Sequence, residues 1–542
     1  MRTPVFALVG LSLTLSAVAD AQTISRPPSP VVTAGAGMKE VIFDWDPVPG
    51  AQTYRLYANT GERGYFVPVS DERLPRSRTR AAIPIAVHKQ EWSKTRYLVQ
   101  ACNSAGCTRS NEVSPASLML ETIGYFKASN TGSNDGLGAQ VALSADGSTL
   151  AVSAGGEDGT NNPLPQSGAV YIYRRNGRKW TQEALLKASD GLANTRLGSA
   201  GNMPLAYRYI GLSANGSTLA VGAPTRERSG LANAGVVFVY QRAADSSWSE
   251  VAQFTGAPAA NDYYGYSVDV SSDGTYIKVN SLYPQGGAGT PEGRTFVWHW
   301  NGQSWGNSGA IAPFYAGDRC PTVRMTADAK LLVSACHTPA GDGRLVTSRR
   351  VTGTDTWLRI ADQAYMWFEN PNMALNYDGS RIAFHEGHPY PWEADGHIGL
   401  YRRNENMWVD QVQWLGASGT VGYNGFGRAI EFSRNGEYLA FSDPIWFASG
   451  AGSMETWTGG SSDGAVLILK LLPGSKPEYS YTRLLKASNP GNLDRFGESL
   501  SFGGADGHYL VVGAPGEDSA ATGIDGDQLS EGAEDSGAAY LY

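Results

Sequence analysis

The chain has 542 residues, of which 66 are glycine, 11% are aromatic and only 17% are charged. This composition is typical of a turn-rich all-β protein and argues against a mainly helical or disordered chain. The formal net charge of −8 and the absence of any Lys/Arg run argue against nucleic acid as a partner.

Residues 1–21 carry the features of a secretory signal peptide. Arg2 precedes an apolar run that ends at Ala19, and Ala19-Asp20-Ala21 forms a small-x-small cleavage site. The run is too short for a membrane span, and no later segment is long and apolar enough to be one. We expect a protein that is secreted or held at the cell surface, with the periplasm as a further option.

Residues 22–36 are rich in Pro, Ser and Gly and are predicted to be a linker. Short alternating strands over residues 27–117 predict an antiparallel β-sandwich. Trp45 with the following Pro-Val-Pro-Gly, and the pattern Tyr97-x-Val-x-Ala-x-Asn-x-x-Gly106, resemble strands and turns of a fibronectin type III domain. The resemblance implies a spacer or binding module without catalytic residues.

The four cysteines fall into two close pairs, and export permits both pairs to form disulfides. Cys102 and Cys107 flank a four-residue Asn-Ser-Ala-Gly turn. Cys320 and Cys336 lie eight residues on either side of Asp328, a hairpin turn in the repeat below, so antiparallel register places them opposite each other. We predict both disulfides; four free buried thiols are the alternative.

Residues 121–542 contain a repeat marked by hairpin turns that are 50 to 71 residues apart. Asp-Gly and Asn-Gly pairs tolerate the positive φ angles of a type I′ turn. After most turns come an apolar strand and a Gly-led strand, and a Trp-led strand follows in five units. Four strands per unit, repeated seven times, predict a seven-bladed β-propeller. The turns are Asp146-Gly147, Asn215-Gly216, Asp273-Gly274, Asp328-Ala329, Asp378-Gly379, Asn435-Gly436 and Asp506-Gly507.

The seventh unit has only three strands of its own. The segment Tyr125-Phe126-Lys127-Ala128-Ser129 copies the Lys-Ala-Ser sequence that ends fourth strands at 187–189 and 486–488. We therefore expect residues 121–128 to supply the outermost strand of the seventh blade. Such closure protects the sheet edges of the ring.

Phe496-Gly497 and Gly513-Ala514-Pro515 resemble the FG-GAP repeat of integrin α-subunit propellers, particularly the secreted bacterial proteins built from such repeats. Phe426-Gly427 and Gly222-Ala223-Pro224 keep half of this signature, and units three to five have lost the Gly-Ala. The resemblance implies an integrin α-like binding or adhesion protein. Integrin-type hairpins often hold calcium, but the turns here offer one side-chain oxygen donor, so that property is not carried over.

The acidic loop from Glu517 to Ser536 offers oxygen ligands for a calcium ion, although no cofactor is required. The alternative, a solvated acidic loop with Asx turns, is favoured. The candidate ligands are Asp518, Asp525, Asp527, Glu531 and Asp535.

The segment from His385 to His397 holds three of the seven histidines together with carboxylates. This combination suits zinc binding or acid/base catalysis. The spacing is not that of a helical metal motif, and prolines exclude a helix there, so a loop packed by its own aromatic residues is favoured.

Aromatic residues in the loops between strands are candidates for ligand binding, because exposed tyrosine and tryptophan stack on sugars and anchor protein interfaces. For any single residue, packing between blades is the favoured interpretation. The candidates are Tyr263, Tyr264, Tyr283, Tyr390, Trp392, Trp446 and Trp457.

The leading hypothesis is an exported, non-enzymatic binding or adhesion protein that recognises a protein or glycan ligand through propeller loops. An extracellular enzyme acting on polysaccharide and a structural cell-surface scaffold are the alternatives, because propellers host many unrelated functions. The identity of the ligand and the oligomeric state are left open.

Overall fold

The computed structural model describes residues 24–61, 64–89, 94–159, 164–201, 208–256, 259–282, 293–311, 318–338, 340, 342–366, 372–386, 397–410, 427–445, 453–454, 463–472 and 479–542. The fold is all-β, with 50% strand and 2% helix. The chain divides into two compact units. The first comprises Met1–Gly35, Ile42–Ala82 and Ser93–Pro115, and the second comprises Ala36–Val41, Ile83–Trp92 and Ala116–Tyr542.

Strands between residues 32 and 109 form two sheets. One has the order β1 (Val32–Gly37), β2 (Glu40–Trp45), β6 (Arg80–Pro84). The other has the order β4 (Val67–Pro68), β3 (Thr53–Asn59), β7 (Arg96–Asn103), β8 (Gly106–Arg109), and β5 (Leu74–Pro75) also pairs with β3. Strand β1 begins inside the segment predicted to be a linker.

Aromatic residues join the two sheets of the first unit. The rings of Phe43 and Tyr97 are 4.9 Å apart, and Trp45 meets Tyr54 edge-on at 5.4 Å. Three short 3₁₀ helices, all within the second unit, are η1 (Val87–Lys89), η2 (Ala116–Leu118) and η3 (Leu120–Thr122).

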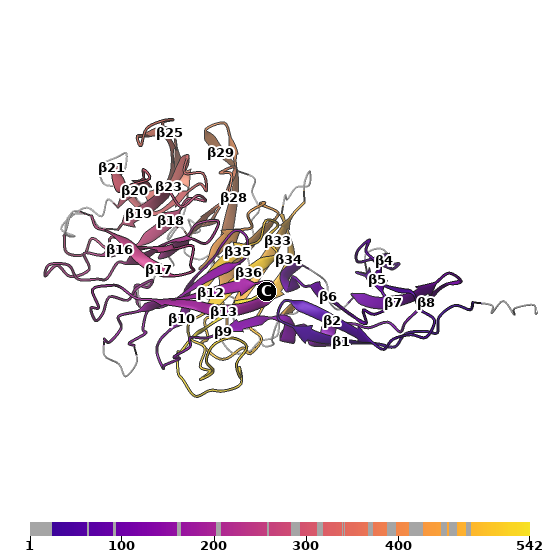
Figure 1. The fold of residues 1–542 in the computed structure, drawn as a ribbon. Helices are drawn as coiled ribbons and strands as arrows, with labels where there is room; N and C mark the ends of the chain where they lie inside the picture. The colour runs from indigo at the N-terminus through magenta and orange to yellow at the C-terminus, as the bar shows by residue number, and fades with distance from the viewer. Residues whose placement is uncertain are drawn as a thin grey trace, which may run out of the picture. The chain divides into compact units, whose positions relative to one another are not determined.

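The described part of the second unit contains seven sheets that follow one another along the chain (Figure 1). Six of them have four strands in antiparallel order, and the sixth sheet has a fifth strand, β32 (Ser453–Met454), beside β34. The strands are β10 (Leu137–Leu143), β11 (Thr149–Ala154), β12 (Ala169–Asn176) and β13 (Lys179–Leu186); β14 (Ile210–Leu212), β15 (Thr218–Ala223), β16 (Val236–Arg242) and β17 (Trp248–Phe254); β18 (Ser267–Val270), β19 (Tyr276–Ser281), β20 (Arg294–Trp300) and β21 (Trp305–Ile311); β22 (Arg319–Met325), β23 (Leu331–His337), β24 (Gly343–Arg350) and β25 (Trp357–Met366); β26 (Met373–Leu375), β27 (Arg381–Glu386), β28 (His397–Asn404) and β29 (Met407–Asp410); β30 (Ile430–Phe432), β31 (Tyr438–Asp443), β33 (Ala465–Leu471) and β34 (Tyr479–Leu485); and β35 (Ser499–Gly503), β36 (Tyr509–Ala514), β37 (Ala538–Leu541) and β9 (Gly124–Phe126).

The first strands of successive sheets contact one another in cyclic order. Strand β10 contacts β14, the contacts continue through β18, β22, β26 and β30 to β35, and β35 contacts β10 again. A ring of sheets with its first strands around a common axis is a propeller-like arrangement.

Strand β9 closes the ring, as the sequence predicts (Figure 1). It pairs antiparallel with β37, and the partners are Phe126 with Ala539, Tyr125 with Tyr540, and Gly124 with Leu541. The prediction that residues near 121–128 supply the outermost strand of the last sheet is therefore confirmed.

The predicted hairpins all form, but their turns are not of type I′. In the last hairpin Gly507 has a φ of 68°, whereas Asp506 is not among the residues with positive φ. The Gly507 amide donates to Gly504 O at 3.1 Å, and the Asp506 carboxylate accepts from the His508 amide at 3.1 Å. A side chain that accepts a hydrogen bond two residues onward stabilises the turn without a positive φ of its own.

The core of the second unit lies between neighbouring sheets. Strands β11 and β15 are buried along their whole lengths, because a sheet lies on each side of them. One cluster joins Leu150 and Tyr171 of the first sheet to Val511 and Ala539 of the seventh, with Phe126 among them. Apolar contacts between neighbouring sheets therefore stabilise the ring.

Both predicted disulfides are present. Cys102 lies opposite Cys107 in the β7–β8 hairpin, with an S–S distance of 2.10 Å. Cys320 of β22 is bonded to Cys336 of β23, with an S–S distance of 2.06 Å. The described cysteines include no free thiol.

Candidate functional site

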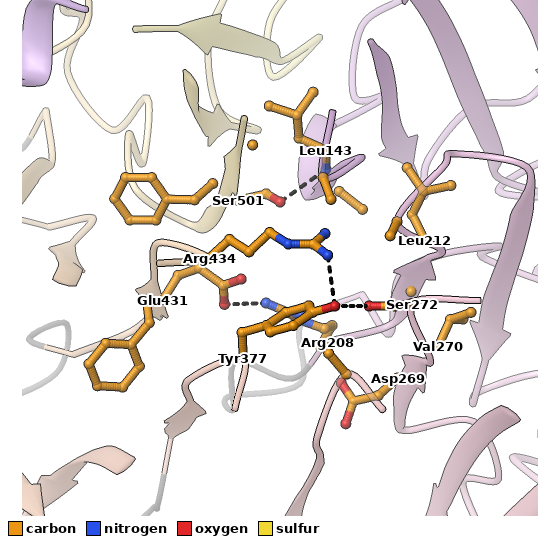
Figure 2. A pocket seen from close by; sticks show the side chains of 18 of the residues that line it. Leu143, Arg208, Leu212, Asp269, Val270, Ser272, Tyr377, Glu431, Arg434 and Ser501 are labelled. Carbon is orange, nitrogen blue, oxygen red and sulfur yellow. Dashed lines mark hydrogen bonds and ion pairs between the residues drawn. The ribbon is translucent and has the colours of Figure 1, made fainter. Parts of the chain in front are cut away.

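A cavity of about 180 Å³ lies where the first strands of the sheets end. Its lining takes residues from the first strand of every sheet and from the hairpin turns that follow several of them (Figure 2). One residue from each first strand, in chain order, is Val141, Ile210, Asp269, Met325, Leu375, Glu431 and Ser501. Because each sheet contributes, the cavity lies on the axis of the ring.

Charged side chains cross this axis. Arg208 forms an ion pair with Glu431, and Figure 2 shows them meeting beneath Tyr377. Asp269 accepts the Met325 amide at 3.1 Å and pairs with Lys278 at 3.1 Å and Arg324 at 3.4 Å. Three cations thus pair with two carboxylates, and these ion pairs connect different sheets of the ring. We call these five residues the axial belt.

Burial and neighbouring charges shift the pKa values of the axial belt residues in different directions. Burial raises the pKa of Asp269, but Lys278 and Arg324 outweigh this effect and leave its pKa below the usual value. Burial lowers the pKa of Lys278 to about 8, although Asp269 opposes the change. For Glu431, burial raises the pKa more than Arg208 lowers it.

Two of the residues that line this cavity, Tyr377 and Arg434, stack on each other. The guanidinium carbon of Arg434 lies 4.1 Å from the ring centroid of Tyr377. The Tyr377 hydroxyl accepts from Arg434 Nη2 at 2.7 Å and from Ser272 Oγ at 3.0 Å (Figure 2). The polar groups of these residues therefore bond to one another.

A second cavity, of about 390 Å³, is lined by residues of the first, second, sixth and seventh sheets and of the segments before them. Gln140 is near the start of β10, Tyr209 directly precedes β14, Arg428 comes shortly before β30, and Glu498 directly precedes β35. We call this cavity the axial chamber. Its polar lining residues are Asn134, Asp135, Gln140, Gln166, Arg196, Ser199, Tyr209, Arg428, Arg495, Glu498 and Asp535.

An unusual backbone conformation shapes the chamber. Before β35, alternate residues adopt positive φ: Leu493 at 69°, Arg495 at 57° and Gly497 at 99°. The same alternation precedes the first and second sheets, at Asn134, Gly136 and Gly138, and at Asn194, Arg196 and Gly198. At Gly138 a side chain is also excluded for steric reasons, because a Cβ there would lie 2.2 Å from Ala538 O.

Two of the chamber's arginines have partners. Arg428 pairs with Glu498, with Nε 2.9 Å from Oε1, and Arg196 donates to Gln166 Oε1. Within the described residues, no hydrogen bond or ion pair engages the Arg495 guanidinium or the Asp535 carboxylate. One donor and one acceptor group therefore remain unused in a largely polar cavity.

Asp135 also lines the chamber, and burial raises its pKa to about 6. Its Oδ2 accepts the Gly132 amide at 2.7 Å. The equivalent bonds run from the Gly491 amide to Asp494 at 2.7 Å and from the Ala259 amide to Asp262 at 3.2 Å. Because the same hydrogen bond recurs in three sheets, we infer that Asp135 stabilises its turn and has no catalytic role.

The aromatic candidates are only partly described. Tyr264 is buried, and its hydroxyl accepts from Trp298 Nε1 at 2.8 Å. Tyr263 packs against a small cluster that contains Tyr209 and Tyr266. Both described candidates thus pack inside the fold. Tyr283, Tyr390, Trp392, Trp446 and Trp457 lie outside the described residues.

Most of the histidine-rich segment, residues 387–396, also lies outside the described part of the chain. His385 lies in β27, where its amide donates to Asn372 O at 3.1 Å. The prediction for this segment stays a prediction.

The acidic loop is described, and several of its carboxylates bond to backbone amides. Asp518 accepts from the Asp535 amide at 2.8 Å, Asp525 from the Tyr125 amide at 3.1 Å, and Asp527 from the Leu529 amide at 3.0 Å. Glu531 is exposed. No group of three or more His, Cys, Asp or Glu side chains that could hold a metal ion is found among the described residues. Calcium binding by the loop stays a prediction.

Four charged residues of the chamber were not among the candidates from the sequence: Arg196, Arg428, Arg495 and Glu498. A signal was present, because each lies within two residues of a Leu-Gly or Phe-Gly pair of the repeat. Superposing the repeats on that pair places these positions before the first strands of three sheets.

Neither a family model nor a curated protein sequence matches the chain. Among solved structures, a putative 6-phosphogluconolactonase from Bacteroides fragilis is 14% identical, with a TM-score of 0.41 over 68% of this chain and 89% of that one. The periplasmic gluconolactonase PpgL of Pseudomonas aeruginosa is 14% identical, with a TM-score of 0.40 over 81% and 98%. Sqt1 of Chaetomium thermophilum, bound to the N-terminus of ribosomal protein L10, is 12% identical, with a TM-score of 0.38 over 72% and 85%.

These scores carry no argument about activity, so the propeller-like arrangement rests on the chain's own strand pairings. Helices in the described part of the chain are all too short or too polar to cross a membrane.

Proposed function

We propose that the chain is an exported seven-bladed propeller protein, with FG-GAP-like repeats and a fibronectin type III-like module, that binds a carbohydrate ligand in the axial chamber. The predicted signal peptide supports export, and the two disulfides fit an oxidising compartment. The recurrent positive-φ glycines before the first strands support a common repeat.

The observation that carries the proposal is the pair of unused groups in the chamber. Arg495 can only donate hydrogen bonds, and an ionised Asp535 can only accept them. A sugar hydroxyl does both, so neighbouring hydroxyls of one sugar ring satisfy the two groups together. Gln140, Ser199 and Tyr209 add further polar atoms to the same wall.

The size and position of the chamber agree with this ligand class. Its volume of about 390 Å³ falls within the range of small-molecule sites, roughly 300–1,000 Å³. The chamber is lined by segments that belong to or precede four successive sheets of the ring. A terminal sugar of a longer glycan therefore fits better than a large protein surface.

The test is a glycan array on the mature protein, followed by calorimetry with the best ligand. We expect Arg495→Gln to lower the affinity by about tenfold to a hundredfold, because a hydrogen bond from a charged group is lost. Arg349→Gln is the matched control, since Arg349 is exposed on β24 and contacts Asn406. Equal affinities for the two variants would contradict binding in the chamber.

An extracellular enzyme acting on polysaccharide is the second candidate, because a carboxyl group with a pKa near 6 suits a general acid. Asp135 has such a pKa and lines the chamber. The recurrence of its turn bond in two other sheets favours a structural role. Turnover of the bound glycan that is abolished by Asp135→Asn would favour the enzyme.

A further inference from the structure

Two buried glutamates in the ring each hold a lysine and an asparagine at once. Lys127 Nζ lies 2.7 Å from Glu517 Oε2, and Asn489 Nδ2 lies 2.9 Å from Glu517 Oε1. The side chains of Lys127 and Glu517 are 0% and 2% exposed. A lysine and a carboxamide are therefore held on the two oxygens of one carboxylate; the lysine and the carboxylate are buried, and Asn489 is half-buried.

The first sheet repeats this arrangement. Lys187 forms an ion pair with Glu157, and Asn130 Nδ2 lies 2.9 Å from Glu157 Oε1. The lysines also share a second contact, since Lys127 donates to Ser536 Oγ at 2.7 Å and Lys187 to Ser167 Oγ at 2.9 Å.

A tyrosine hydroxyl donates to each asparagine carbonyl. Tyr540 donates to Asn489 Oδ1 at 2.6 Å, and Tyr171 donates to Asn130 Oδ1 at 2.7 Å. Burial raises the pKa of both tyrosines, so the hydroxyls stay protonated. A fixed donor on the carbonyl oxygen stabilises the negative charge that develops there when a nucleophile attacks.

We propose that these clusters form intramolecular amide bonds, one between Lys127 and Asn489 and one between Lys187 and Asn130. Neither bond is part of the binding function proposed above. The carboxylate of Glu517 or Glu157 takes a proton from the lysine ammonium, and the free amine attacks the asparagine Cγ. A new C–N bond forms, the bond from Cγ to Nδ2 breaks, and the glutamate passes protons to the departing nitrogen.

The reaction balances without any other reactant. A lysine ammonium and an asparagine carboxamide give one secondary amide and one ammonium ion, and the glutamate returns to its ionised form. Burial lowers the pKa of Lys127, although Glu517 opposes the change, and a lower pKa eases formation of the amine. Held together in one site, the two groups react as if at very high concentration.

The positions of the bonds give them a role in closing the ring. Lys127 directly follows β9, the fourth strand of the seventh sheet, and Asn489 lies in the segment that leaves the sixth sheet. Lys187 follows the fourth strand of the first sheet, and Asn130 lies in the segment that leaves β9. Each bond would join one sheet to the preceding one, and both lie beside the strand that closes the ring.

The next sheet offers an internal comparison. There Arg226 pairs with Asp190, at the positions that hold glutamate and asparagine in the other two clusters. Thr255 follows β17 where Lys187 follows β13, so this cluster has no amine. A guanidinium stays protonated and is not a nucleophile, and no bond forms there.

The test is peptide mapping of the reduced and alkylated mature protein by tandem mass spectrometry. We expect two branched peptides, one joining Lys127 to Asn489 and one joining Lys187 to Asn130, each lighter by one ammonia than the sum of its parts. The branched peptides decide the question, because the N-terminal glutamine expected after signal removal also loses ammonia when it cyclises. Linear peptides with free Lys127 and Lys187 would overturn the proposal.

Variants separate the reaction from a structural role. Glu517→Gln keeps the size of the side chain but cannot take the proton, so we expect the Lys127 bond to be lost and the Lys187 bond to remain. Asn489→Asp should still form the bond, now with loss of water, and give the same branched peptide as the wild type. A branched peptide that persists in Glu517→Gln would exclude the role given to this carboxylate.

Discussion

The seam between the sixth and seventh sheets and the region of the third and fourth sheets have the same strand order but are held together differently. At the seam, Lys127, Glu517 and Asn489 form a buried hydrogen-bond network. In the third sheet, Trp298 stacks on Phe254 of the preceding sheet at 4.1 Å. The fourth sheet carries the Cys320–Cys336 disulfide.

The repeat signature is intact in the seventh unit and degenerate in the third to fifth units. Since four-stranded sheets form in both regions, the signature is not needed to make a sheet. Its glycines permit close approach between sheets, and Lys127, Glu517 and Asn489 add hydrogen bonds between the sixth and seventh sheets. The signature is therefore needed for the contacts at the seam and for the shape of the chamber, and not for forming a sheet.

The largest effect is expected from deleting residues 121–128. The deletion exposes β37, removes the fully buried Tyr125 and Phe126, and leaves Glu517 buried without Lys127. We expect the second unit to lose roughly 6–10 kcal/mol, measured by chemical denaturation, because apolar burial and a buried ion pair are lost together. A variant that unfolds at the denaturant concentration of the parent would contradict ring closure by β9.

The next effect concerns the buried charges of the third sheet. Asp269→Ala leaves Lys278 and Arg324 facing each other without their shared carboxylate, and we expect a loss of about 3–5 kcal/mol at pH 7. Because the pKa of Asp269 is lowered, its stabilisation is present above its unfolded pKa and is lost as the pH falls through the folded value. The difference between wild type and variant should therefore shrink in acid.

Lys470→Ala is the control for this prediction. Lys470 pairs with Glu437 at 3.6 Å, and both side chains are exposed. We expect a change of about 1 kcal/mol or less, as is usual for a surface pair. Equal losses in Asp269→Ala and Lys470→Ala would show that the axial belt does not stabilise the ring.

Removal of the Cys320–Cys336 disulfide tests the part of the ring that lacks the signature. The bond closes a loop with a sequence separation of 16 residues. We expect the Cys320→Ser/Cys336→Ser variant to lose about 3 kcal/mol, measured by thermal unfolding of the oxidised proteins. With reductant present, the parent should approach the variant; a parent that remains more stable by the same margin would exclude a contribution from the bond.

The smallest effect has the opposite sign and lies at the seam. Burial raises the pKa of Asp494 to about 7, so its ionised form is unfavourable in the folded state. The stabilisation from its protonated form is complete below the unfolded pKa and is lost as the pH rises through 7. Asp494→Asn should therefore add about 1–2 kcal/mol at pH 8 and nothing at pH 4, by denaturation at both pH values. A variant that is less stable at pH 8 would contradict this.

Much of the fold could be predicted from the sequence because its signals are local. An Asp-Gly or Asn-Gly pair between apolar runs marks a hairpin, and the Lys-Ala-Ser copy after Phe126 marks the closing strand. The cysteine spacings relative to a turn gave both disulfides. The turn type was missed, because the carboxylate of Asp506 holds the turn through the His508 amide and no positive φ is needed at Asp506.

The chamber could not be predicted in the same way, because it forms only when the ring closes. Arg196, Arg428 and Arg495 are far apart in the sequence and line one cavity because the sixth, seventh, first and second sheets follow one another around the ring. Nothing local distinguishes Arg495, which has no partner in the described part of the chain, from Arg428, which is paired with Glu498. The aromatic candidates were chosen by residue type, whereas the chamber residues are marked by their position beside a Leu-Gly or Phe-Gly pair.

A crystal structure of the mature protein with its best glycan from the array tests the central claim most directly. The account predicts that sugar hydroxyls lie within hydrogen-bond distance of Arg495 and Asp535, inside the axial chamber. A glycan bound on an outer loop, with the chamber free of sugar, would contradict it.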